Sequence, residues 1–225
     1  MVSELLKIKK GVTAVIGGGG KTTLLHTLAT ELKEKGTVII TTTTHILPST
    51  IFHNVIDDTI SLPRLSEQLS QHKCICLGKQ TLNGKLCTTS HTFDDLCSVA
   101  DYVLVEADGS KHLPLKAHLD FEPVIPIEST QIITVVGVDC VGKKLEDATH
   151  RCDKACELLA CNKEDIITEK MVAQLINTEN LHDKVLINKC DSVKEKTTAE
   201  LISGYIKTEC VISSLLKGEW YVSSN

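Results

Sequence analysis

The chain has 225 residues, a net charge of −5, and 42% hydrophobic but only 3% aromatic residues. This length fits a single domain, residues 1–225, with a mostly aliphatic core. Because the chain has no basic stripe and no apolar run of about 18 residues, neither a nucleic-acid partner nor a membrane span is expected. The N-terminus has too short an apolar part for a signal peptide, so a cytoplasmic protein is predicted.

Strand-like and helix-like runs alternate from end to end. GVTAVIG at 11–17 predicts a buried strand, and KTTLLHTLATELKEKG at 21–36 predicts a helix that ends at its glycine. Further strands are expected at 37–43, 73–78, 101–109, 131–139 and 184–191, with a last edge strand at 209–215. Further helices are expected at 94–100, 151–160, 168–177 and 194–207. Residues 109–130, with three prolines, predict a long ordered loop.

Several of these strands are continuous apolar runs without polar alternation. Such strands are buried when helices cover both faces of a sheet, so they predict an α/β fold with a mostly parallel, doubly wound sheet. Ligands of these sheets bind beyond the carboxyl ends of the strands. Residues with chemical roles are therefore expected directly after strands.

The glycine run after the first strand is the strongest functional signal. In VIGGGGKTT the second half of the phosphate-loop pattern G-x-x-x-x-G-K-[ST] is complete, but Val15 stands at its first glycine. Loop amides and the N-terminus of the following helix attract phosphate oxygens, Lys21 would reach the β- and γ-phosphates, and Thr22 would bind Mg²⁺. A flexible turn is the alternative. The nucleotide-binding candidates here are Gly17, Gly18, Gly19, Gly20, Lys21, Thr22 and Thr23.

Two more strand ends carry oxygen-bearing side chains. YVLVEADGS ends an apolar run in two acids, and either Glu106 or Asp108 would hold Mg²⁺ or orient an attacking water. TTTTH would place the hydroxyls of Thr42 to Thr44 near the γ-phosphate or Mg²⁺, with His45 as a general base. Ordinary strand-end carboxylates and β-branched strand residues are the alternatives.

The residues NKCD at 188–191 follow a predicted strand and resemble the N-K-x-D guanine motif of GTP-binding proteins. Asp191 would accept hydrogen bonds from the N1–H and the amino group of guanine. Adenine has no N1–H and cannot form this pair of bonds. Asn188 would contact the base or brace the loop, and the stem of Lys189 would pack over the base. The motif favours GTP over ATP, with a structural turn or another base as the alternative.

Cations and thiols complete the candidates. Arg151 would act as an arginine finger in cis, and Lys111 and Lys116 would bind an anionic substrate, unless they are ordinary surface residues. The ten cysteines contain no C-x-x-C pair and are expected to be free, partly buried thiols. The alternative is metal or selenium binding by pairs such as Cys152 with Cys156 or Cys74 with Cys76.

Five blocks together resemble the YqeC family, accessory proteins for selenium-dependent molybdenum hydroxylases: VIGGGGKTT, TTTTH, VLVEADGSKHLPLKAHLDFEPVIP, VVGVDCVGKKLEDATHR and VLINKCD. The resemblance runs from about residue 11 to residue 191. It implies a role in maturing a selenium- and molybdenum-containing cofactor, with a molybdenum hydroxylase or a maturation protein as partner. The site residues that it implies are Lys21, Thr22, Glu106, Asp108, Gly109, Lys116, Glu122, His150, Arg151, Asn188 and Asp191. Cys140 and Cys190 receive no selenium role, since many relatives differ there.

The expected protein is a P-loop NTPase of the SIMIBI-like class that binds Mg²⁺ with GTP or ATP, hydrolyses it slowly, and forms a homodimer as members of that class do. A small-molecule kinase with Lys116, His118 and Arg151 on the substrate is one alternative. A non-catalytic carrier of a cofactor or selenium through its thiols is another. The catalytic candidates are Lys21, Glu106, Asp108 and Arg151, the metal candidates are Thr22, Glu106 and Asp108, and the substrate-binding candidates are Lys116 and His150.

Overall fold

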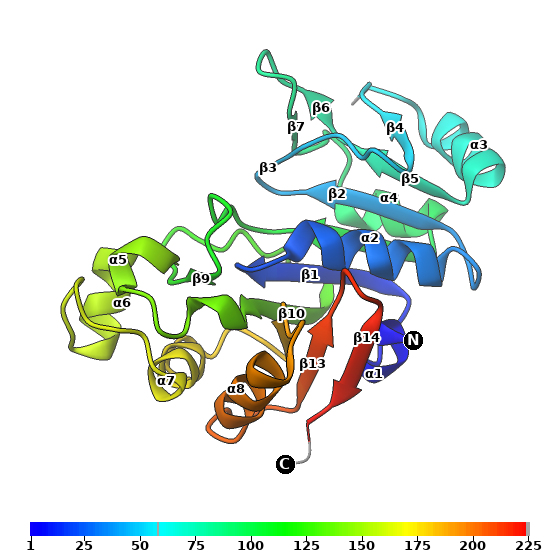
Figure 1. Ribbon diagram of the computed structural model, residues 1–225. Coiled ribbons are helices and arrows are strands. Elements are labelled where there is room, and N and C mark those ends of the chain that lie inside the picture. The colour runs from blue at the N-terminus through cyan, green and yellow to red at the C-terminus, as the bar shows by residue number, and fades with distance from the viewer. Residues whose placement is uncertain (58, 224–225) are drawn as a thin grey trace.

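A computed structural model describes residues 1–57 and 59–223. A nine-stranded sheet forms its centre (Figure 1). Neighbouring strands are parallel except the last two along the chain, which confirms the predicted α/β fold with a mostly parallel sheet. The spatial order of the strands is β14 (Glu219–Val222), β13 (Cys210–Ser214), β12 (Lys184–Asn188), β10 (Ser129–Gly137), β1 (Gly11–Gly17), β8 (Tyr102–Glu106), β2 (Val38–Thr42), β5 (Cys74–Leu77) and β4 (His53–Val55).

Helices and two small sheets surround this centre. The small sheets contain β3 (His45–Ile46), β7 (Leu86–Cys87) and β6 (Lys79–Gln80), and β11 (Thr149–His150) with β9 (Leu115–Lys116). The helices are α1 (Val2–Leu5), α2 (Lys21–Leu32), α3 (Leu62–His72), α4 (Phe93–Val99), the 3-10 helix η1 (Val138–Cys140), α5 (Leu145–Ala148), α6 (Cys152–Leu159), α7 (Glu169–Glu179) and α8 (Val193–Ser203). None of the helices in the described residues is long and apolar enough to cross a membrane.

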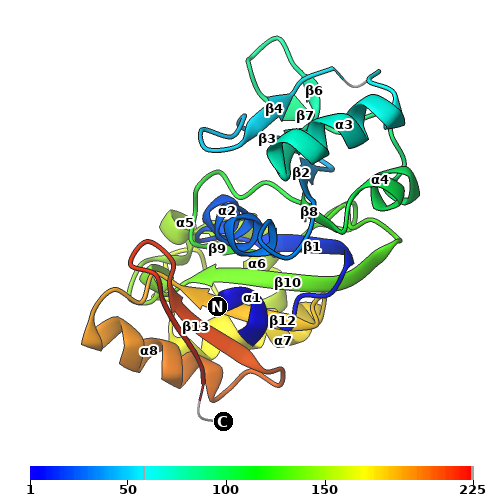
Figure 2. The ribbon, with the colours of Figure 1, turned by 90° about the vertical axis from the view of Figure 1, so that its right-hand side faces the viewer.

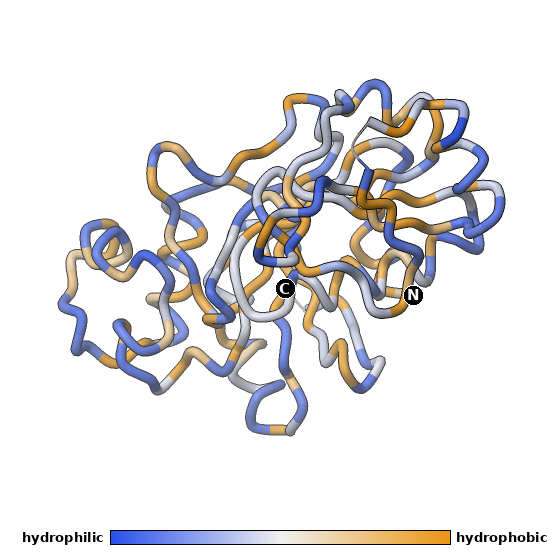
Figure 3. Tube along the Cα trace, turned by 90° about the horizontal axis from the view of Figure 1, so that it is seen from above, coloured by the Kyte–Doolittle hydropathy of each residue, from blue (hydrophilic) through white to orange (hydrophobic). Residues whose placement is uncertain are grey.

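Both faces of the sheet are apolar because helices cover both. Side chains alternate along β1, so that Val15 packs with Leu24 and Leu28 of α2, whereas Ala14 and Ile16 pack with α3 and α4 on the opposite face. The helices α5 to α8 cover β10, β12 and β13 in a third cluster. Figure 3 shows hydrophobic segments running through the middle of the trace and hydrophilic stretches around its outside.

The strand β1 occupies the position where the winding of the sheet reverses. The strands β2, β4, β5 and β8 lie on one side of β1, and β10, β12, β13 and β14 lie on the other. In both ribbon views β3, β6, β7 and α3 stand at one end of the molecule and α8 at the other (Figures 1 and 2). Ligands of doubly wound sheets bind at such a reversal point, and the glycine run follows β1 directly.

Some predicted elements differ from the structure. The strand predicted at 209–215 is present as β13, but it does not form the edge of the sheet, because β14 pairs antiparallel with it there. The predicted loop at 109–130 contains β9 and the start of β10. Sequence patterns did not predict α3, whose only buried apolar residues, Leu65 and Leu69, are too few for a clear helical pattern.

The start of α8 offers a test of stability. Ser192 caps this helix: its hydroxyl accepts from the Glu195 N–H at 3.3 Å, and the Glu195 carboxylate accepts from the Ser192 N–H at 2.7 Å. We expect Ser192→Ala to lower the free energy of unfolding by about 1 kcal/mol in urea titrations. Ser192→Asp, which keeps a capping oxygen, should restore most of it. A loss as large with Asp as with Ala would contradict the capping role.

Candidate functional site

Backbone neighbours leave no room for a side chain at Gly17, the last residue of β1, or at Gly19 in the loop before α2. Gly17 has a φ of 92° and a Cβ there would lie 2.3 Å from the carbonyl oxygen of Val135. Gly19 has a φ of 78° and its Cβ would lie 2.1 Å from the amide nitrogen of Gly137. Both approaches are far inside van der Waals contact, and positive φ strains other residues. Val15, where the phosphate-loop pattern has its first glycine, is instead a fully buried residue of β1.

The N-terminus of α2 presents free backbone donors beside this loop. The amides of Gly18 and Gly19 donate to protein carbonyls, at 2.9 and 3.2 Å. Within the described residues no backbone carbonyl accepts from the amides of Lys21, Thr22 or Thr23, as expected for a first helical turn. Such a turn attracts anions through its N–H groups and the helix dipole.

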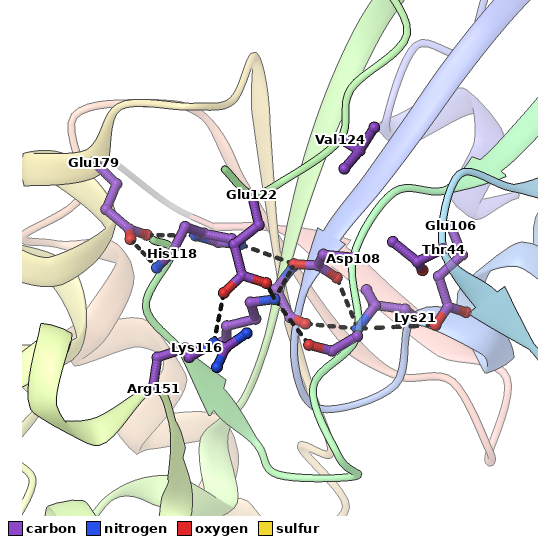
Figure 4. Close-up of polar contacts among 12 residues, drawn as sticks. Lys21, Thr44, Glu106, Asp108, Lys116, His118, Glu122, Val124, Arg151 and Glu179 are labelled. Atoms are coloured by element: carbon purple, nitrogen blue, oxygen red, sulfur yellow. Dashed lines mark hydrogen bonds and ion pairs between the residues drawn. The ribbon is translucent and has the colours of Figure 1, made fainter. Parts of the chain in front are cut away.

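Lys21 is buried and already partnered. Its ammonium donates to the carbonyl of Gly17 at 2.7 Å and lies 3.0 Å from Asp108 Oδ1 and 4.0 Å from Glu106 Oε1 (Figure 4). Only 4% of its side chain is exposed. Two carboxylates from the end of β8 therefore balance the charge of Lys21.

Glu106 joins the acidic strand end to α2 and β2. Its Oε2 accepts from the Thr22 hydroxyl at 2.9 Å, and its backbone carbonyl accepts from the Thr42 hydroxyl at 2.8 Å. Burial raises the pKa of Glu106 despite the opposing charge of Lys21. The TTTTH stretch thus reaches the site through Thr42, whose hydroxyl also accepts from the Thr44 N–H at 2.9 Å, while His45 is an exposed residue of β3.

Asp108 has a different set of partners from Glu106. Its Oδ2 accepts from the Gly17 N–H at 2.8 Å, lies 2.8 Å from His118 Nε2, and is 3.5 Å from the ammonium of Lys116. Burial by itself would raise the pKa of Asp108, but the bond from His118 and the charges of Lys21 and Lys116 outweigh it and lower the pKa to about 2. Asp108 is therefore a permanently ionised anchor of the glycine loop.

The sequence did not predict that two further residues, His118 and Glu179, support Asp108. His118 bridges Asp108 and Glu179, the last residue of α7, and sequence reasoning considered it only as a substrate contact of a kinase. Its spacing of ten residues from Asp108 places it on the loop that returns past the strand end. No pattern marks Glu179, which lies 61 residues further along the chain.

A second group of charges extends from Asp108 toward solvent. The pairing of β9 with β11 places His150 beside Lys116. Lys116 is fully buried and donates to Glu122 and to the Gly109 carbonyl, each at 2.8 Å, and Arg151 Nε donates to Glu122 at 2.7 Å. The two cations outweigh burial and lower the pKa of Glu122.

The outer members of this group differ in exposure. Arg151 keeps 35% of its side chain exposed, has a φ of 64°, and places its guanidinium 5.7 Å from the centre of the Phe121 ring. Burial and the nearby Lys116 and Arg151 lower the pKa of His150. Lys111 is exposed in a turn.

The NKCD residues meet the glycine loop from the other half of the sheet. Asn188, at the end of β12, donates to the Gly19 carbonyl at 2.9 Å and accepts from the Ser213 hydroxyl and the Leu215 N–H, each at 3.2 Å. Asn188 therefore braces the loop. Asp191 is exposed just beyond it and accepts from the Ser214 hydroxyl, and Lys189 pairs with Asp139 at 3.0 Å.

All ten cysteines are buried or partly buried. All ten are free thiols, as expected, and within the described residues no group of three or more His, Cys, Asp or Glu side chains is arranged to hold a metal ion. Burial raises the pKa of Cys152 to about 11 and the pKa of Cys140 and of Cys190 to about 12. These thiols are protonated at neutral pH, which makes them poor nucleophiles.

Comparisons with known proteins match the part of the chain that carries the glycine run and the acidic end of β8. The profile of a family described as YqeC protein matches residues 13–153. "Uncharacterized protein YqeC" of Escherichia coli (strain K12) is 37% identical over 146 residues, which cover 62% of this chain and 57% of that protein. A solved structure of the signal recognition particle 54 kDa protein from Aeropyrum pernix K1 in complex with GDP superposes with a TM-score of 0.42 at 11% identity, covering 96% of this chain and 44% of that one. The chain thus spans less than two thirds of the length of either protein.

Proposed function

The chain belongs to the YqeC family, and from this premise and the geometry of the glycine loop we propose that it binds a nucleoside triphosphate with Mg²⁺ and hydrolyses it slowly. One observation carries the proposal: Lys21, the Thr22 hydroxyl and Glu106 converge at the free N-terminus of α2, at the reversal point of the sheet. Phosphate oxygens would accept hydrogen bonds from the amides of the first helical turn, and Lys21 would move from Asp108 to the β- and γ-phosphates.

The oxygen ligands beside Lys21 suit Mg²⁺. The Thr22 hydroxyl and the Glu106 carboxylate lie 2.9 Å apart, and Mg²⁺ in phosphate sites takes one or two such protein ligands with phosphate oxygens and water. We assign the ion to Thr22 and Glu106 and not to Asp108, whose Oδ2 accepts from the Gly17 N–H and also faces His118 and Lys116. When bound, Mg²⁺ would neutralise charge on the phosphates.

The remaining residues would bind, orient and stabilise. Asp108 would fix the glycine loop, and Thr42 would fix Glu106 through its backbone carbonyl. Lys116 and Glu122 would hold Arg151, whose partly exposed guanidinium would stabilise the charge that develops on the transferred phosphate. His150 would border the same space as a substrate contact.

We propose GTP as the nucleotide because Asn188, at the end of β12, braces Gly19, and the exposed Asp191 follows it three residues later. Asp191→Asn is expected to lower the affinity for GTP about tenfold and to leave ATP affinity within twofold, since an amide keeps only part of the acceptor pair for guanine. Calorimetric titration of Mg²⁺-GTP and Mg²⁺-ATP on both proteins measures this. Equal losses for the two nucleotides would assign NKCD to a structural turn.

The same titration with GTP, GDP, ATP and ADP tests the proposed function as a whole. Micromolar binding of a triphosphate that requires Mg²⁺, with slow release of inorganic phosphate, supports it. A protein that binds none of the four nucleotides would overturn it.

The family resemblance supports a biological role as an accessory factor in maturing a selenium- and molybdenum-containing cofactor, with a hydroxylase or maturation protein as partner. Hydrolysis that such a partner accelerates would support a nucleotide-driven switch. The partly exposed guanidinium of Arg151, which pairs with Glu122, is the observation that favours a small-molecule kinase as second candidate. A phosphorylated product formed without a partner would favour that candidate.

A further inference from the structure

A buried histidine connects the candidate nucleotide site with α7. Figure 4 shows the His118 ring between two carboxylates, with Nε2 at 2.8 Å from Asp108 Oδ2 and Nδ1 at 3.0 Å from Glu179 Oε2. Its backbone N–H also donates to Glu179 Oε1 at 2.6 Å. A histidine with a carboxylate at each ring nitrogen donates from both only as the imidazolium. Burial by itself would lower the pKa of His118, but the bonds to Asp108 and Glu179 outweigh it and raise the pKa.

The contacts continue from Asp108 to the glycine loop. The same Oδ2 that faces His118 accepts from the Gly17 N–H at 2.8 Å. A continuous series of hydrogen bonds therefore runs from Glu179 through His118 and Asp108 to Gly17. The side chains of His118 and Asp108 are 4% and 0% exposed, so water does not replace these bonds.

The hydrogen bond from His118 to Asp108 matters most when Lys21 binds phosphate. Lys21 is 3.0 Å from Asp108 and would leave it for the β- and γ-phosphates. Lys116, at 3.5 Å, is engaged by Glu122 and Gly109 at 2.8 Å. A buried carboxylate that loses its cation is strongly destabilised, and His118 is the hydrogen-bonded cation that stays.

We propose that His118 and Glu179 are positioning residues of the nucleotide site: Glu179 fixes the His118 ring, and the ring keeps Asp108 seated on Gly17 when Lys21 moves to the phosphates. The inference rests on the proposed function for the movement of Lys21. The seating of Asp108 on Gly17 is independent of nucleotide.

Amide hydrogen exchange on the nucleotide-free protein tests that seating. We expect His118→Gln and Glu179→Gln to speed exchange at Gly17 about tenfold relative to Ile16 of the same strand, because the acceptor of the Gly17 N–H loosens. His182→Gln is the matched control, since His182 lies near Glu179 but has no hydrogen bond with Asp108. Unchanged exchange at Gly17 in both variants overturns the proposal. If His118→Gln does not fold, the rate of exchange at Gly17 in Glu179→Gln decides, because Glu179 lies at the edge of the site.

The ratio of GTP affinity to GDP affinity tests the movement of Lys21. We expect the ratio to fall about tenfold in His118→Gln, because only the triphosphate draws Lys21 fully from Asp108. A purely structural contact would weaken both nucleotides equally and leave the ratio unchanged, which would overturn the positioning role. If the wild type binds neither nucleotide, the proposed function fails, and hydrogen exchange still decides whether His118 seats Asp108.

Discussion

Lys21→Met is expected to lower the affinity for a Mg²⁺-bound triphosphate about 100-fold, because a charge-assisted bond to each of two phosphates is lost, about 3 kcal/mol together. Methionine keeps the length of the buried stem, and Asp108 keeps His118 and Lys116 as partners, so the fold should persist. Calorimetric titration against GTP measures the affinity, and far-ultraviolet circular dichroism checks the fold.

Lys194→Met, on the exposed side of α8, is the matched control for the loss of one charge. Its affinity should equal that of the wild type. If Lys21→Met binds the triphosphate as tightly as the control does, the glycine run is only a turn and the proposed phosphate site is wrong.

Glu106→Gln is expected to lower the rate of triphosphate hydrolysis about 100-fold and to raise the Mg²⁺ concentration needed for half-maximal rate. Glutamine still accepts from the Thr22 hydroxyl, so the geometry at 2.9 Å can persist while the charge that attracts the ion is lost. Steady-state phosphate release across a Mg²⁺ titration measures both effects. Because the pKa of Glu106 is raised, protons compete with Mg²⁺ for its carboxylate. The apparent affinity for Mg²⁺ should therefore fall as the pH falls.

Glu67→Gln, an exposed residue of α3, is the control for that variant. It should keep the wild-type rate and the wild-type dependence on Mg²⁺. An equal loss of rate at saturating and limiting Mg²⁺ in Glu106→Gln would assign Glu106 to another role than metal binding.

Several parts of this protein were predicted from the sequence because contiguous residues encode them. A run of apolar residues identifies a buried strand such as β8, and the glycine run before Lys21 encodes its own backbone conformation, which Gly17 and Gly19 adopt at positive φ. The predicted strands that became β1, β2, β5, β8, β10, β12 and β13 lie in the main sheet for this reason.

Elements with few apolar residues and partners distant in sequence were decided only by the tertiary structure. The edge strand β14 and the helix α3, which buries only Leu65 and Leu69, gain their stability from packing that local patterns do not record. Asn188 reaches Gly19 across 169 residues, and Glu179 reaches His118 across 61. Glu106 is proposed to bind Mg²⁺ and Asp108 to fix the glycine loop, and this difference likewise follows from the side chains that surround each carboxylate. Such contacts arise because crossover connections bring the ends of separate strands to one edge of the sheet, and a linear sequence carries no local signal of which side chains will meet there.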